Sequence, residues 1–423
     1  MTDLAAARHV LRSTFGFAEF RPGQAAILAS VLAGRNVLAI MPTGSGKSLC
    51  YQLPALLRDR PTVVVSPLIA LMRNQVAQLN AVGIAAATLN SANDIAQNRE
   101  ITNRLTGGGL RLIYVSPERL ARPDTRALLK RANVGLLAVD EAHCISQWGH
   151  AFRPEYLQIG DARRELGSVQ TAAFTATADF ATRADIVDKL FGGKAAVFAH
   201  GFDRPNLRLR IEAKRSGFGQ VTEFVRAHAG ESGIVYCGSR RKTEELSDVL
   251  RSCGVNARPY HAGLDPLRRA RHQDLFLQQE AVVIVATIAF GLGIDKPDVR
   301  FVLQADLPAN IESYYHEIGR AGRDGLAADT LTLYGDDDIR LRRLQIAQSE
   351  ASAAQKEIDR RRLDALVEMC ESTACRRRSL LAYFGETAEP SCGNCDICLK
   401  PSRWLRVFHR FARRSASGHS PFP

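Results

Sequence analysis

The chain has 423 residues and a net charge of +12; 46% of its residues are hydrophobic and 24% are charged. This is the composition of a globular protein of two or three domains, and no apolar run reaches the roughly 18 residues that a membrane helix requires. The N-terminus has an early acid and no long apolar stretch, so we expect no secretory signal, no membrane association and a cytoplasmic location. The excess positive charge indicates either a nucleic-acid partner or a merely solvated basic surface.

Two series of short apolar segments alternate with helical patterns along the chain. Each segment is strand-sized and apolar throughout, as in a buried parallel sheet with helices on both faces. The first series is NVLAIM, TVVVSP, LRLIYVSP, GLLAVDEAH and TAAFTATA. The second, from about Gly233, is SGIVYC, VNARPYHAGL, AVVIVAT, VRFVLQAD and DTLTLY. The sequence therefore predicts an α/β fold with two tandem doubly wound parallel-sheet domains, joined near residues 202–206.

The pattern changes after Tyr334 to a polar, arginine-rich pair of helices, which four clustered cysteines close. The last segment has five arginines and no acid, so it reads as disordered. We expect two sheet domains at residues 1–203 and 204–335, a small helical domain at 336–400, and a basic tail at 401–423.

The stretch MPTGSGKS lies between an apolar strand and a helical pattern. Such a loop presents backbone N–H groups and a helix N-terminus to phosphate oxygens, with lysine as a point charge and a serine hydroxyl as an Mg²⁺ ligand. The alternative is a glycine-rich turn with a chance lysine. The candidate nucleotide-binding residues are Thr43, Gly44, Ser45, Gly46, Lys47 and Ser48.

Two acids end the apolar strand of LLAVDEAH. The carboxylate of Asp140 is placed to hold Mg²⁺, and that of Glu141 to orient and deprotonate a water molecule. The alternative is that both acids only cap a helix. Together with the phosphate loop, they predict hydrolysis of a nucleoside triphosphate.

A pair of arginines, Arg320 and Arg323 in IGRAGRDG, falls in the second domain at helical spacing. An arginine inserted across a cleft neutralises charge that develops on the γ-phosphate. Closure of the cleft would then couple hydrolysis to domain movement. The alternative is a pair of surface salt bridges.

The ordered set of motifs resembles the RecQ family of superfamily 2 helicases, from about Phe15 to Leu399. FRPGQ is similar to the family's adenine-recognition motif, in which Arg21 and Gln24 would read the base and Phe17 would stack on it. The other matching segments are MPTGSGKSLCYQLPAL, SPLIALMRNQV, DEAHCISQWGHAFRPEY, FTATA, VATIAFGLGIDKPDVRFV and ESYYHEIGRAGRDG. The resemblance implies two RecA-like domains, a zinc-binding domain, and ATP and Mg²⁺ as substrate and cofactor.

The loop after the acids is rich in aromatic residues, and the resemblance implies that it senses single-stranded DNA. Bases stack on aromatic rings at about 1 to 3 kcal/mol each without sequence preference, and arginine adds a phosphate contact. The matching residues are Trp148, His150, Phe152 and Arg153. Alternatively, Trp148 and Phe152 are core residues. Ala151 stands where the family usually has an acid, which would weaken coupling between DNA and hydrolysis.

The clustered cysteines Cys375, Cys392, Cys395 and Cys398 have the spacing C-x16-C-x2-C-x2-C. Four thiolates favour a closed, structural Zn²⁺ site, and an iron–sulfur cluster is the alternative. The neighbouring arginines 376–378 either contact duplex phosphates or form a solvated face. The remaining five cysteines are expected to be buried free thiols.

The resemblance implies an ATP-dependent DNA helicase that moves 3′ to 5′ on single-stranded or forked DNA, acts in recombination and repair, and associates with the nucleoid. Family members commonly continue into a winged-helix domain that separates strands, whereas this sequence ends soon after Cys398. We therefore keep two alternatives, a DNA-stimulated ATPase or translocase without strand separation and a non-catalytic DNA-binding fragment. We also expect either a truncated or frameshifted product or a naturally short form.

Overall fold

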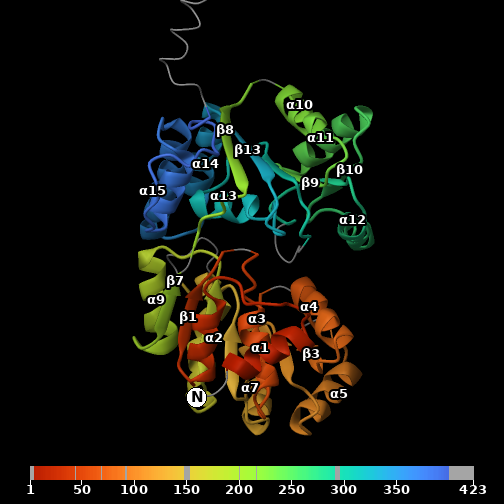
Figure 1. Cartoon of the computed structure of the whole chain (residues 1–423), viewed down its shortest axis with the longest axis vertical. Helices are drawn as coiled ribbons and strands as arrows, with labels where there is room; N and C mark the ends of the chain where they lie inside the picture. Colours follow the sequence, from red (N-terminus) through yellow and green to blue (C-terminus); the bar gives the residue numbers. More distant parts are fainter. Residues whose placement is uncertain are drawn as a thin grey trace, which may run out of the picture.

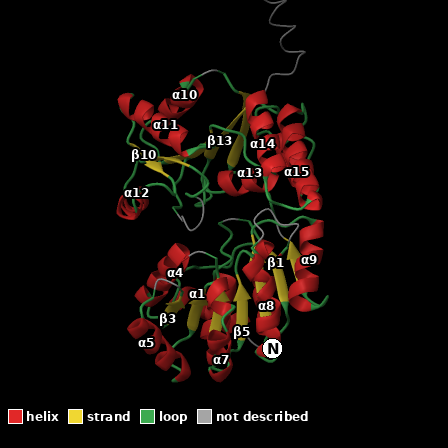
Figure 2. Cartoon of the chain, turned by 180° about the vertical axis from the view of Figure 1, so that it is seen from behind, coloured by secondary structure: helices red, strands yellow, loops and turns green. Residues whose placement is uncertain are grey.

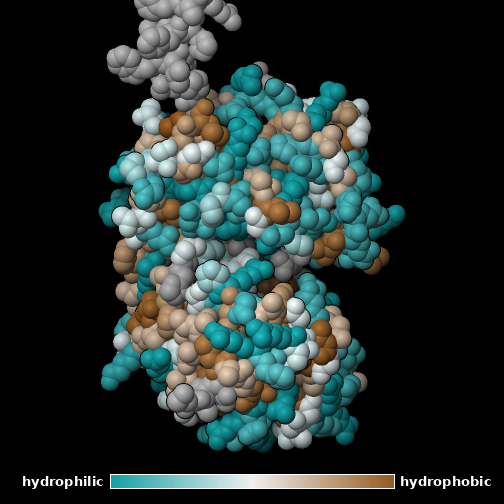
Figure 3. All heavy atoms as spheres, viewed as in Figure 1, coloured by the Kyte–Doolittle hydropathy of each residue, from teal (hydrophilic) through white to brown (hydrophobic). Residues whose placement is uncertain are grey.

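The computed structural model describes residues 4–399 except 43, 68, 91–92, 147–152, 200, 216 and 291–295. Two α/β lobes are stacked along the long axis, and a group of helices lies beside the second lobe (Figure 1). None of the described helices is long and apolar enough to cross a membrane. Hydrophilic side chains cover most of the face in Figure 3, where hydrophobic ones form small scattered groups.

The first lobe contains a parallel sheet whose described strands follow the order β3-β4-β2-β5-β6-β1-β7. Its strands are β1 Val37–Ile40, β2 Thr62–Val65, β3 Ala86–Leu89, β4 Leu112–Val115, β5 Leu136–Val139, β6 Thr171–Thr175 and β7 Ala196–Ala199. Its helices are α1 Leu4–Ser13, α2 Gln24–Leu32, α3 Leu49–Leu56, α4 Ile69–Ala81, α5 Ile95–Thr106, α6 Pro117–Leu120, α7 Pro123–Arg131, the 3₁₀ helix η1 Ala142–Ile145, α8 Pro154–Glu165 and α9 Phe180–Phe191.

Both faces of this sheet are buried, which explains its continuous apolar strands. In β1, Val37 and Ala39 belong to the core cluster with residues of α2 and α3, while Leu38 and Ile40 belong to the one with α8 and α9. Helices α1, α2 and α3 lie in front of the sheet in Figure 1, and α8 lies in front of it in the reverse view of Figure 2.

The second lobe repeats this design with a parallel sheet of order β10-β11-β9-β12-β13-β8. Its strands are β8 Leu207–Ala213, β9 Gly233–Tyr236, β10 Ala257–Tyr260, β11 Val283–Ala286, β12 Phe301–Gln304 and β13 Ala328–Tyr334. Its helices are α10 Gly219–Ala227, α11 Arg240–Ser252, α12 Pro266–Gln278 and α13 Ile311–Ile318. The predicted pair of tandem parallel-sheet domains is confirmed.

Among the residues that the structure describes, three helices follow the second sheet, where the sequence predicts two. They are α14 Asp336–Gln348, α15 Ala353–Glu371 and α16 Arg376–Tyr383. The prediction was wrong because it did not place the break before Cys375, where the chain leaves α15 and the cysteine precedes α16 as its N-cap.

Candidate nucleotide site between the two lobes

The phosphate loop turns from β1 into α3 through two glycines in the left-handed region, Gly44 at φ 83° and Gly46 at φ 81°. A side chain at either position would be strained. The Lys47 ammonium donates to the carbonyl oxygens of Met41 (3.1 Å) and Pro42 (3.3 Å), so it is folded back over the loop. Ser48 accepts a hydrogen bond from the Gln75 amide at 3.0 Å. Thr43 lies outside the described residues.

The predicted adenine-recognition residues contact the backbone of this loop. The Gln24 amide donates to the carbonyls of Ser45 (3.0 Å) and Gly46 (3.1 Å) and accepts from the Arg21 backbone N–H at 2.8 Å. The Arg21 guanidinium donates to the Gly44 carbonyl. The Phe17 ring is 52% exposed. The structure therefore brings FRPGQ to the phosphate loop and leaves one aromatic ring available to a base.

The two acids follow β5 at the carboxyl edge of the sheet. Asp140 is buried, and burial together with neighbouring Glu141 raises the pKa of its carboxyl to about 7, while Lys47 opposes the shift. Glu141 has φ 50°, a left-handed conformation that is strained for a residue with a side chain. Its side chain caps no helix, and its buried Oε2 has no hydrogen-bond partner among the described residues. Such a group suits a reacting water better than a structural role.

A histidine of the same motif connects Glu141 to the second lobe. His143 Nδ1 lies 3.4 Å from Glu141 Oε2 and 2.8 Å from the Thr175 hydroxyl. Burial, with positive charges nearby, lowers its pKa to about 3, so its ring is neutral near neutral pH. The His143 ring packs near the ring of His316 in α13, with 5.9 Å between the ring centroids, and His316 Nε2 lies 2.8 Å from the Thr177 hydroxyl.

The sequence patterns do not predict these contacts. FTATA offered a signal, because threonines at the end of a buried strand need polar partners, but no spacing rule predicts which partner the second lobe supplies.

The two arginines of the second lobe have different surroundings. Arg323 packs on the phosphate loop, with its Cγ 3.3 Å from where a Cβ on Gly44 would lie. Burial lowers the pKa of Lys47, and the positive charge of Arg323 lowers it further, whereas the charges of Glu141 and Asp140 raise it. Arg320 is buried near Tyr236 and Glu317 inside its own lobe.

The predicted helical spacing of the pair is wrong. Helix α13 ends at Ile318, so both arginines lie in the turn beyond it. The two side chains therefore have different neighbours: Arg323 contacts the phosphate loop of the first lobe, whereas Arg320 lies among residues of its own lobe.

Three of the four predicted DNA-sensing residues, Trp148, His150 and Phe152, lie outside the described residues, as does Ala151. Arg153 directly precedes α8, and its guanidinium donates to the Pro67 carbonyl at 3.4 Å. Its charge also contributes to the low pKa of His143, though burial is the largest cause. The end of the aromatic loop is thus anchored close to the acid motif.

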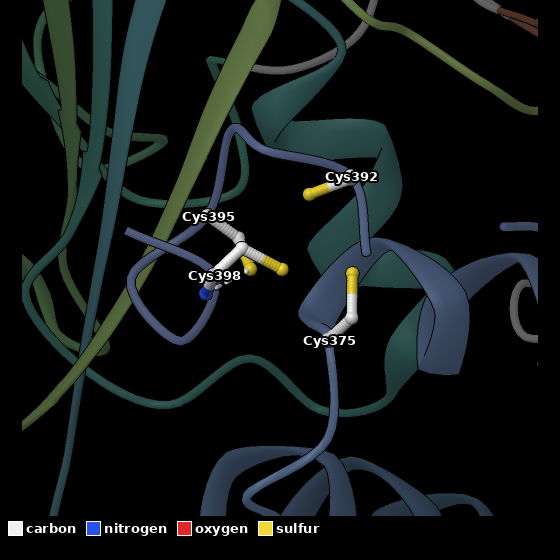
Figure 4. Close-up of side chains that lie close together, drawn as sticks. All are labelled: Cys375, Cys392, Cys395 and Cys398. Atoms are coloured by element: carbon white, nitrogen blue, oxygen red, sulfur yellow. Dashed lines mark hydrogen bonds between the residues drawn. The ribbon is translucent and has the colours of Figure 1, made fainter. Parts of the chain in front are cut away.

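The four clustered cysteines meet near the start of α16. Their sulfur atoms lie within 4.8 Å of one another and face a shared space (Figure 4). Tetrahedral Zn–S bonds of about 2.3 Å place sulfurs about 3.8 Å apart, so this donor set fits Zn²⁺ with a small contraction. Two of the cysteines are buried and two half-buried, as expected for a closed structural site.

Two other predictions about arginines and cysteines are wrong. Arg376 and Arg377 neither form a solvated face nor reach for DNA, because both are buried, in ion pairs with Asp396 and Asp203. Only Arg378 of the three is exposed. Of the cysteines outside the cluster, four are buried as predicted but Cys253 is exposed, since it follows α11 at its solvent end.

The phosphate loop, the paired acids and an arginine from the second lobe meet between two RecA-like domains, an architecture of the helicase type. Three family models match the chain: "DEAD/DEAH box helicase" at residues 21–186, "Helicase conserved C-terminal domain" at 217–325 and "RecQ zinc-binding" at 336–399. The "ATP-dependent DNA helicase RecQ" of Haemophilus influenzae is 47% identical over 395 residues, which are 93% of this chain and 64% of that protein. The protein of the same name from Bacillus subtilis is 42% identical over 397 residues, 93% of this chain and 66% of its own length.

The chain belongs to the RecQ family of helicases. It spans about two thirds of the length of these relatives. Solved structures agree on the fold: the Mycobacterium smegmatis helicase Lhr bound to ssDNA and AMP-PNP has a TM-score of 0.62 at 20% identity, covering 86% of this chain and 57% of its own. The DUF1998 helicase MrfA bound to DNA and AMPPNP has a TM-score of 0.67 at 15% identity, covering 100% of this chain and 61% of its own.

Proposed function

We propose that this chain is an ATP- and Mg²⁺-dependent DNA helicase module in which both lobes build one hydrolytic site. The observation that carries the proposal is the packing of Arg323, from the second lobe, on Gly44 of the phosphate loop, beside Lys47 and the two acids. A site shared between two lobes completes itself only when they approach, so hydrolysis and movement are coupled.

The residues divide the chemistry of hydrolysis among them. Backbone N–H groups of the loop and Lys47 bind the β- and γ-phosphates, and Ser48 and Asp140 would hold Mg²⁺, whose charge offsets that of the phosphate oxygens. Glu141 accepts a proton from water as the water oxygen bonds to the γ-phosphorus and the bond to the ADP oxygen breaks. Arg323 stabilises the charge that develops on the γ-phosphoryl oxygens. Phe17 stacks on the adenine.

DNA binding follows from the net charge, the aromatic loop and the names of the relatives, which are DNA helicases. Opening and closing of the lobes moves the chain 3′ to 5′ along single-stranded DNA, held mainly by its phosphates. Forked DNA, a role in recombination and repair, and a cytoplasmic location at the nucleoid belong to the same proposal.

ATP hydrolysis and unwinding of a forked duplex, measured with and without single-stranded DNA, test this function. We expect DNA to stimulate hydrolysis, strands to separate, and Lys47→Ala to abolish both. Stimulated hydrolysis without strand separation would leave a translocase. DNA binding without ATP turnover would leave a non-catalytic fragment and contradict the proposal.

A further inference from the structure

The segment that joins the two lobes, residues 201–206, contacts the turn that carries Arg323. Its Arg204 guanidinium donates through Nη2 to the carbonyls of Ala321 and Gly322, both at 2.8 Å, and through Nη1 to that of Gly319 at 3.4 Å. These carbonyls lie just past the end of α13, where backbone acceptors lack helical partners and positive charge is favourable. Arg204 therefore ties the joining segment to this turn.

Asn206 makes a second contact to the same turn. Its Nδ2 donates to the carbonyls of Gly322 (2.9 Å) and Leu326 (2.8 Å), so it ties together the two sides of the turn. Gly322 has φ 56°, and a Cβ there would lie 2.5 Å from Asn206 Nδ2 and 2.8 Å from the Leu326 oxygen. The contact is too close for any side chain but hydrogen, so the turn has little room to shift.

The joining segment is itself held by α13 and by the C-terminal part of the described chain. The Phe202 N–H donates to the Glu386 carboxylate at 3.1 Å, and the Phe202 carbonyl accepts from the Tyr315 hydroxyl at 3.0 Å. Asn394, from the cysteine-rich loop, donates to the Pro205 carbonyl at 3.0 Å. Arg204 and Asn206 thus work from a fixed base.

We propose that Arg204 and Asn206 are positioning residues that hold the turn so that Arg323, the residue after Gly322, meets the phosphate loop. Neither residue belongs to the proposed ATP- or DNA-binding groups. The inference rests on the proposed hydrolytic function. A planar guanidinium satisfies several carbonyls at once, whereas a lysine ammonium lacks that fork. A displacement of about 1 Å at a catalytic group costs about 100-fold in rate.

The test is steady-state ATP hydrolysis of the full chain with saturating single-stranded DNA. We expect Arg204→Ala to lower kcat about 100-fold and leave the KM for ATP within about threefold, and Asn206→Ala to lower kcat about 10-fold. Arg208→Ala removes a nearby arginine that is 45% exposed and serves as the control, with wild-type kcat. Because Arg204 acts through Arg323, the double variant Arg204→Ala/Arg323→Ala should be no slower than Arg323→Ala alone.

Losses that multiply in the double variant, or a wild-type kcat in Arg204→Ala, would overturn the inference. If Arg204→Ala fails to fold, Asn206→Ala with Arg323→Ala completes the same cycle. Hydrogen exchange of residues 319–326 adds a readout independent of turnover. Exchange should be faster in Arg204→Ala and in Asn206→Ala than in Arg208→Ala, and equal rates would contradict the inference. A wild-type chain without ATP turnover refutes the proposed function, and the exchange rates then still decide whether Arg204 holds the turn.

Discussion

The nucleotide site and the cysteine site differ in where their residues come from. The first unites Lys47 with Arg323 from another lobe. It also contains a strained Glu141, whose buried Oε2 accepts no hydrogen bond among the described residues. The second lies within residues 375–398, and its loop is bonded to β8 through Leu209, which donates to the Asn394 carbonyl and accepts from Asp396. A strained backbone and a buried polar atom without a hydrogen bond are typical of residues kept for function. Residues whose hydrogen bonds are all made locally are typical of a structural site. Changes in the first site should alter rate, and changes in the second should alter stability.

The largest expected effect is the loss of a metal ligand. In small zinc modules, metal binding supplies on the order of 10 kcal/mol of folding free energy. Cys395→Ser should therefore release zinc and unfold the region around α16, detected as lost zinc content and fast hydrogen exchange there. The exposed Cys253→Ser is the control. Native exchange in a zinc-free Cys395→Ser chain would show that the metal is not structural.

Next in size is the removal of the general base. Glu141→Gln should lower kcat for ATP about 1,000-fold, because the amide cannot accept the proton of water. Stability should not fall, since the change removes a buried charge without a hydrogen-bond partner. Thermal unfolding beside Glu118→Gln, which alters an exposed acid of the same lobe, checks this. If the loss in free energy of unfolding were as large as the increase in activation free energy for hydrolysis, the two sites would not differ in the way proposed.

Arg362 of α15 sharpens the contrast, because it joins all three parts of the chain. Its guanidinium lies 3.2 Å from Asp179 of the first lobe and 3.4 Å from Glu312 of α13, and it is 6% exposed. Arg362→Met leaves both acids without this buried partner, which costs about 3 kcal/mol.

The neighbouring Arg361→Met, at a side chain 76% exposed, should cost less than about 0.5 kcal/mol. Chemical denaturation compares the two variants. Equal stabilities would mean that the helical domain does not hold the lobes together.

The smallest effect is expected at Phe17. Loss of stacking on adenine, worth about 1 kcal/mol, should raise the KM for ATP about fivefold in Phe17→Ala and leave kcat unchanged. Ile95→Ala, at a side chain 89% exposed on the same lobe, is the control. An unchanged KM would remove Phe17 from the nucleotide site.

Sequence predicts what local pattern determines. Continuous apolar runs predict the buried central strands, and the cysteine spacing predicts a closed metal site. The missed strands β3, β7 and β8 are edge strands of their sheets. Strand β8 carries polar side chains on one face, so it lacks the continuous apolar run of a central strand. The short strand β7, AVFA, is apolar throughout, and its residues alternate between half-buried and exposed.

Long-range relations escaped prediction. Arg376 and Arg377 read as a basic surface because their acidic partners are distant in the chain or hidden in the cysteine loop. The separate environments of Arg320 and Arg323 depend on where α13 ends, and the turn that follows is bonded to Arg204, over 100 positions earlier in the chain.

The central claim is that the second lobe completes the hydrolytic site through Arg323. Its most direct test is single-turnover ATP hydrolysis by Arg323→Ala with saturating single-stranded DNA. An arginine of this kind contributes about 1,000-fold or more, so the rate should fall by that factor while ATP affinity changes little. A wild-type rate in this variant would contradict a site shared between the lobes.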